Sequence, residues 1–190
     1  MAIIVVGGSA KGVGKTTLVC GLIAALDRFH WTAVKITTDA HQGLPPIHEE
    51  KSAGPETGTA RYLAAGAARA FLLTVPPQRN LAQVLDEFWP RIGRGANFIF
   101  ESNRAMDFVE ADLRLLVDGR STTARTEPKP SFWGAMLLAD ALVVRADADS
   151  VVSGDSVYGE PARPIFHLKH LDNISAEMKR WIEKCPGLTP

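Results

Sequence analysis

A glycine-rich segment near the start of the chain has the residue types and spacing of a phosphate-binding loop. Residues 8–17 read Gly-Ser-Ala-Lys-Gly-Val-Gly-Lys-Thr-Thr. Gly12 and Gly14 let the backbone curl so that its N–H groups point at phosphate oxygens. Lys15 supplies a cation for the β- and γ-phosphates, and the Thr16 hydroxyl is placed to bind Mg²⁺. The segment therefore predicts a site for a nucleoside triphosphate and its Mg²⁺ ion.

The context of this loop is that of a true phosphate-binding loop, although one position departs from the strict pattern. Ser9 stands where G-x-x-x-x-G-K-[ST] has its first glycine. An apolar run at 3–6 precedes the loop and a helical pattern starts at Leu18, which gives the strand, loop and helix that the motif requires. The residues predicted to contact the nucleotide are Ser9, Lys11, Gly12, Val13, Gly14, Lys15, Thr16 and Thr17.

Two acidic residues follow segments that read as strands. Glu101 ends the apolar run 98–100, and Asp39 comes shortly after the strand predicted at 32–37. Lys35 lies within that strand, where a buried ammonium group needs a partner. Carboxylates at such strand ends act beside phosphate-binding loops through Mg²⁺ or water. A solvated acid at position 101 and a plain turn residue at position 39 are the alternatives.

These residues have separate expected roles. Thr16, Asp39 and Glu101 form the predicted Mg²⁺ site, because Mg²⁺ prefers oxygen ligands. Lys15, Asp39 and Glu101 are the predicted catalytic residues of a slow nucleoside-triphosphate hydrolase, with Asp39 as a candidate for orienting the attacking water.

A short motif in the second half of the chain bears on the choice of base. Arg145 and Asp147 follow a predicted strand at the place where many GTP-binding proteins carry Asn-Lys-x-Asp, with Val144 replacing the asparagine. The arginine is able to stack on a base, and the aspartate is able to accept both guanine hydrogens. The motif favours GTP over ATP, and a surface Arg–Asp turn is the alternative.

The elements that position these residues alternate between strands and helices. Seven short apolar runs read as strands: 3–6, 32–37, 70–75, 97–100, 113–117, 141–144 and 164–167. The pattern predicts an α/β protein with the three-layer P-loop NTPase fold, a mostly parallel sheet of about seven strands and helices on both faces. We expect one domain over 1–190, with irregular loops at 38–56 and 119–131 near the ligand edge of the sheet.

Composition excludes several classes of partner. Lys plus Arg number 21 and Asp plus Glu number 21, so no large field favours nucleic acid. No run approaches the roughly 20 apolar residues of a membrane span. The two cysteines have no C-x-x-C spacing, which is typical of a reducing cytoplasm.

Several segments, in order, resemble the molybdopterin-guanine dinucleotide biosynthesis accessory protein B family and its close P-loop relatives. They are 12–17, the strand 34–37 with Asp39 and His41, 58–67, the following strand ending at Val75, and Phe100-Glu101-Ser102-Asn103. The resemblance implies Mg²⁺ and GTP (or ATP) as ligands, weak GTPase activity, a partner from molybdenum-cofactor assembly and a possible homodimer.

Two other functions stay open on the same residues. Lys35 with Asp39 is similar to the corresponding stretch of dethiobiotin synthetase, which implies an ATP-dependent ligase or transferase acting on a small acid. The third hypothesis is a nucleotide-gated interaction protein, because no clear general base or nucleophile accompanies the loop.

Overall fold

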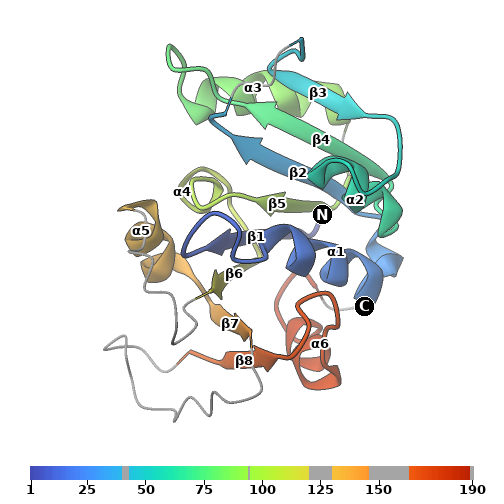
Figure 1. Ribbon diagram of the computed structural model, residues 1–190, viewed down its shortest axis with the longest axis vertical. Helices are drawn as coiled ribbons and strands as arrows, with labels where there is room; N and C mark the ends of the chain where they lie inside the picture. Colours follow the sequence, from blue (N-terminus) through green and yellow to red (C-terminus); the bar gives the residue numbers. More distant parts are fainter. Residues whose placement is uncertain (40–42, 94, 120–129, 146–162, 189–190) are drawn as a thin grey trace.

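The centre of the molecule is a single twisted sheet. The computed structural model of the 190-residue chain describes residues 1–39, 43–93, 95–119, 130–145 and 163–188. The strands are β1 (Ile3–Gly8), β2 (Thr32–Thr37), β3 (Ile47–Glu50), β4 (Arg69–Thr74), β5 (Phe98–Glu101), β6 (Leu113–Asp118), β7 (Ala141–Arg145) and β8 (Ile165–Leu168). They lie in the order β3-β4-β2-β5-β1-β6-β7-β8 (Figure 1). All neighbours are parallel except β3 and β4.

Helices cover both faces of this sheet. They are α1 (Lys15–Ala25), α2 (Gly58–Ala64), α3 (Leu81–Ile92), α4 (Ala105–Phe108), α5 (Pro130–Leu138) and α6 (Ala176–Ile182), with a 3-10 turn at Asp27–Phe29. Ile4 and Val6 of β1 belong to a core shared with α1, α2 and α6. Ile3 and Val5 belong to a second core with α3, α4 and α5. Because side chains alternate along a strand, these two cores lie on opposite faces, which confirms the predicted three layers.

Side-chain caps begin several of these helices. Thr57 accepts a hydrogen bond from the Ala60 N–H at 3.0 Å and starts α2. Asn80 forms a reciprocal capping box with Gln83 and starts α3. A side-chain oxygen satisfies an N–H that lacks a partner in the first turn, so the helix start is encoded locally.

The prediction that 38–56 has no regular structure is wrong, because β3 lies within it and brings the sheet to eight strands. β3 pairs antiparallel with β4, from Ile47 opposite Leu73 to Glu50 opposite Ala70. The Thr74 N–H donates to the Pro46 carbonyl at 2.8 Å, just before the strand begins. An edge strand needs partners on one side only, and charged residues are common there, so its apolar pattern is weak.

The parallel order brings the carboxyl ends of β1, β2, β5, β6 and β7 to one edge of the sheet. Of the loop predicted at 119–131, positions 120–129 lie outside the described residues. Within the described part of the chain, no helix is long and apolar enough to cross a membrane.

Candidate functional site

The glycine-rich loop connects β1 to α1 and has the backbone that its sequence predicts. Gly12 has φ 84° and Gly14 has φ 102°, both in the left-handed region that glycine adopts without strain. Gly14 is also the N-cap residue of α1. The first N–H groups of that helix therefore start at the loop, with the positive end of the helix dipole.

The loop is fixed to the neighbouring strand ends by polar contacts. Asn103 Oδ1 accepts from the Gly8 N–H at 2.7 Å, and Asn103 Nδ2 donates to the Gly8 carbonyl at 3.0 Å. Ser9, which we expected to contact the nucleotide, is buried. Its N–H donates to the Val117 carbonyl at 2.9 Å, and its Oγ accepts from the Gly119 N–H at 3.0 Å. The serine side chain thus ties the loop to the end of β6.

Two other predicted loop residues have distinct surroundings. Val13 is half-buried, and a Cβ added to Gly119 would lie 2.6 Å from Val13 Cγ1, so the two loops pack closely. Thr17 Oγ1 accepts from Arg61 Nη2 of α2 at 3.3 Å. Thr17 therefore links the first turn of α1 to α2.

A cleft of about 440 Å³ opens beside the loop at the carboxyl edge of the sheet. Its charged lining residues are Lys11, Lys15, Lys35, Arg61, Arg104, Asp39 and Glu101. Five cations against two carboxylates give a local positive excess in a chain with zero net charge. Such a concave, positive surface suits a polyanion such as a triphosphate.

The two lysines of the loop differ in their contacts. Lys15 Nζ donates to the Ala10 carbonyl at 3.0 Å, across the loop itself. Lys11 Nζ lies 3.5 Å from Asp39 Oδ2, and their side chains are 85% and 70% exposed. A pair as exposed as this contributes little, typically about 0–1 kcal/mol.

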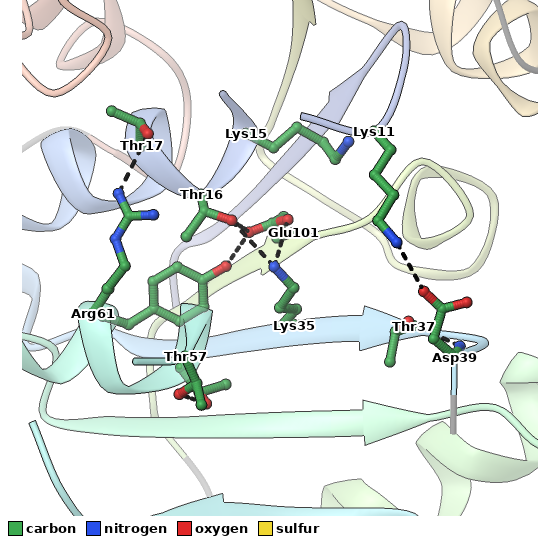
Figure 2. A network of polar contacts seen from close by, with 12 residues as sticks. Lys11, Lys15, Thr16, Thr17, Lys35, Thr37, Asp39, Thr57, Arg61 and Glu101 are labelled. Carbon is green, nitrogen blue, oxygen red and sulfur yellow. Dashed lines mark hydrogen bonds and ion pairs between the residues drawn. The ribbon is translucent and has the colours of Figure 1, made fainter. Parts of the chain in front are cut away.

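Four side chains from four separate segments, Thr16 among them, contact one another at one end of the cleft, and Figure 2 labels Thr16, Lys35 and Glu101. We call Thr16, Lys35, Tyr62 and Glu101 the Glu101 cluster. Thr16 Oγ1 donates to Glu101 Oε2 at 2.6 Å, and the Tyr62 hydroxyl donates to the same oxygen. Lys35 Nζ lies 3.1 Å from both Glu101 Oε1 and Thr16 Oγ1. Lys35 and Glu101 are also direct neighbours in the register of β2 and β5.

The protonation of Tyr62 follows from its surroundings. Burial raises the pKa of Tyr62 well above its usual range, and the adjacent Glu101 carboxylate raises it further. The hydroxyl therefore keeps its proton and acts as a fixed donor. Glu101 accepts from three donors and is 6% exposed. The contacts suit it to orienting a cation more than to abstracting a proton from water.

The oxygen atoms of the Glu101 cluster are of the types that can bind Mg²⁺. Thr16 and Glu101 present hydroxyl and carboxylate oxygens, the ligand types that Mg²⁺ prefers. The ammonium group of Lys35 already lies against both, so these oxygens are arranged to hold a cation. No group of three or more His, Cys, Asp or Glu side chains that could hold a metal occurs among the described residues.

The remaining predicted residues are not brought to this cluster. The carboxylate of Asp39 points to Lys11 and lies apart from Thr16 and Glu101 (Figure 2). Arg145 ends β7 and is exposed. Asp147 lies outside the described residues, so the proposed guanine-binding pair is not placed.

Sequence reasoning missed the roles of Tyr62, Arg61 and Arg104. Tyr62 is fully buried and Arg61 reaches Thr17, although both entered the sequence analysis only as part of the segment 58–67. The sequence signal for Tyr62 was a single aromatic residue in a segment of mostly small residues. Arg104 also lines the cleft and directly follows Asn103, which holds the backbone of Gly8.

A phosphate loop after the first strand, an acid at the end of the adjacent parallel strand and helices on both faces define the P-loop nucleoside-triphosphatase fold. Solved structures of similar fold support this assignment. HypB from Helicobacter pylori, in complex with nickel, matches with a TM-score of 0.58 and 16% identity over 95% of this chain and 85% of that one. The chain therefore has the fold of P-loop nucleotide-binding proteins, as the sequence predicts.

Two further structures are similar. LpxK from Aquifex aeolicus, in complex with ATP, matches with a TM-score of 0.51 and 15% identity over 88% of this chain. The match covers 53% of LpxK, so the chain spans about half of that protein. A MobB protein homolog from Bacillus stearothermophilus matches over 97% of both chains with 18% identity, but its TM-score of 0.48 is too low to bear on function. No protein-family model and no curated protein matches the chain.

Proposed function

We propose that the chain binds a Mg²⁺–nucleoside triphosphate in the cleft and hydrolyses it slowly. The observation that carries this proposal is the 2.6 Å contact between Thr16 and Glu101 beside a loop with two left-handed glycines. That combination joins a phosphate cradle to a pair of oxygen ligands. Isothermal titration with Mg·GTP and Mg·ATP tests it, and absence of heat with both nucleotides would refute it.

The residues of the cleft have separate tasks in this proposal. Backbone N–H groups of the loop and Lys15 hold the phosphates, while Asn103 keeps the loop in place. Thr16 and Glu101 hold Mg²⁺, which supplies neutralisation of phosphate charge. Catalysis then consists mostly of positioning and charge stabilisation.

Slow hydrolysis is consistent with the contacts of the two carboxylates. Glu101 is occupied by three donors, and Asp39 is paired with Lys11. Asp39 can orient an attacking water only after it leaves Lys11. Because both side chains are exposed, that step costs about 0–1 kcal/mol.

We propose GTP as the favoured nucleotide and an accessory role in molybdenum-cofactor assembly as its use. β7 is separated from β1 only by β6 and runs parallel to both. Arg145, the last residue of β7, therefore lies at the same edge of the sheet as the loop. Asp147 follows two residues later. The role in molybdenum-cofactor assembly is supported by the order of the segments that resemble the accessory protein B family. The free thiols of Cys20 and Cys185 suit a cytoplasmic protein. Equal affinity for ATP and GTP would remove the guanine assignment.

An ATP-dependent transferase or ligase acting on a small acid is the second candidate. Lys35, Arg61 and Arg104 line the cleft in addition to the lysines of the loop, so a second anion has cations available. This candidate requires hydrolysis of ATP to accelerate when the right acid is added. A screen of small carboxylic acids that leaves the basal rate unchanged would count against it.

A further inference from the structure

We propose that Lys35 is the resident cation of the metal subsite. Its ammonium group holds Thr16 and Glu101 in position while the cleft lacks nucleotide, and it withdraws from Thr16 when Mg²⁺–nucleotide binds. Lys35 is thus a positioning residue, and this inference rests on the proposed function. It makes Lys35 a competitor of Mg²⁺ for the same oxygen atoms.

Lys35 contacts the same two side chains that are assigned to Mg²⁺. Lys35 Nζ lies 3.1 Å from Thr16 Oγ1 and 3.1 Å from Glu101 Oε1, so one ammonium group bridges both oxygens assigned to Mg²⁺. A hydroxyl has one proton and two lone pairs. The Thr16 hydroxyl donates a hydrogen bond to Glu101 and accepts one from Lys35, which leaves little room for a second cation at the same oxygen.

The positive charge of Lys35 balances the negative charge of Glu101. Glu101 is 6% exposed, and a carboxylate this deeply buried needs a counter-charge. Lys35 supplies it, and within the described residues no other ion pair to Glu101 is present. A Mg²⁺ ion at the same oxygens would repel an ammonium group held 3.1 Å away, so both cannot keep these positions.

The ammonium group of Lys35 can move into the open cleft beside it. The side chain of Lys35 is 29% exposed, and both Lys35 and Thr37 of β2 line the open cleft. Gly58 at the start of α2 makes this arrangement possible, because a Cβ at that position would lie 2.9 Å from Lys35 Nζ and 3.2 Å from its Cδ. The absence of a side chain at Gly58 therefore leaves room for the lysine in its present position against Thr16 and Glu101, and the open cleft is the space into which it withdraws.

The experiment is a titration of nucleotide binding against free Mg²⁺, from EDTA to millimolar metal, with Lys35→Gln compared to wild type. Glutamine keeps an N–H donor and removes the positive charge. We expect the half-saturating Mg²⁺ concentration to fall several-fold. Lys51→Gln is the matched control, because Lys51 is 75% exposed and pairs with Glu49 at the edge of the sheet. It is expected to keep the wild-type Mg²⁺ dependence.

Other results overturn the inference. An unchanged or higher half-saturating Mg²⁺ concentration in Lys35→Gln rejects it, and so does an equal loss of nucleotide affinity with and without metal, which would make Lys35 a phosphate ligand. If wild-type protein binds no nucleotide, the proposed function itself fails. Should Lys35→Gln not fold by circular dichroism, Gly58→Ala replaces it. That variant keeps every charge but crowds Lys35 Nζ, and we expect a smaller shift in the same direction.

Discussion

The two sides of the cleft are built in different ways. The phosphate loop is one continuous segment whose shape comes from glycines with positive φ and from backbone contacts to neighbouring strand ends. The Glu101 cluster joins side chains from α1, β2, α2 and β5, which are far apart in the sequence. Local sequence therefore specifies the loop, whereas the sheet order and register specify the cluster.

This difference separates binding from stability. The loop presents N–H groups and lysines that gain partners from a ligand, so changes there mainly affect nucleotide affinity. The Glu101 cluster contains a buried carboxylate whose donors are already in the protein, so changes there affect the free energy of unfolding as well. Substitutions on each side test this separation.

Lys15→Ala is expected to have the largest effect. Removing a cation that we propose contacts the phosphates should weaken triphosphate binding by about 3 kcal/mol, or roughly 150-fold in Kd. Isothermal titration measures this loss, and circular dichroism checks that the fold is kept. Unchanged affinity would mean that the nucleotide binds elsewhere, and that the loop is not the binding side of the cleft.

Tyr62→Phe tests the Glu101 cluster with little change in ring packing. The variant removes one donor from a buried carboxylate, which should lower the free energy of unfolding by about 2 kcal/mol. Urea denaturation at neutral pH measures this change. A variant as stable as wild type would show that the tyrosine contributes packing alone.

Gly12→Ala and Gly66→Ala form a matched pair. Both glycines have positive φ, 84° and 103°, and open space around an added Cβ. Each substitution should cost about 1 kcal/mol of stability, because left-handed backbone is strained for alanine. Only Gly12→Ala should also weaken nucleotide binding, since Gly66 ends α2 outside the cleft. Equal binding by the two variants would show that the loop backbone is not part of the site.

Sequence reasoning predicted the parts of the site that depend on neighbouring residues. The loop, the strand 32–37 and the apolar strand ending at Glu101 all have local signals, and the structure confirms them. β3 was missed because Ile47 is its only apolar residue, the other three being His48, Glu49 and Glu50.

The Glu101 cluster was beyond sequence reasoning for another reason. Lys35 was expected to need a partner if buried, but the partner depends on β5 lying directly beside β2, which no local pattern encodes. The position of Tyr62 likewise depends on how α2 packs against α1 and the sheet. Contacts between distant segments are fixed by topology, so residue types alone suggested candidates without assigning their partners.

The smallest expected effect is at the edge of the sheet, at Glu49 of β3. This carboxylate is half-buried, whereas that of Glu101 is buried. Hydrogen bonds from Arg69 and Lys51 lower the pKa of Glu49 from 4.5 to about 2. Its contribution to stability is therefore complete above pH 4.5 and is lost as the pH falls toward 2. Because its partner Lys51 is 75% exposed and Arg69 is 35% exposed, solvent screens both pairs, and we expect Glu49→Gln to cost about 0.5 kcal/mol at pH 7. Urea midpoints between pH 7 and 3 should fall less steeply in the variant. Equal slopes would show that the pairs formed by Glu49 add nothing, and a loss as large as that of Tyr62→Phe would remove the distinction between the half-buried carboxylate of Glu49 and the buried one of Glu101.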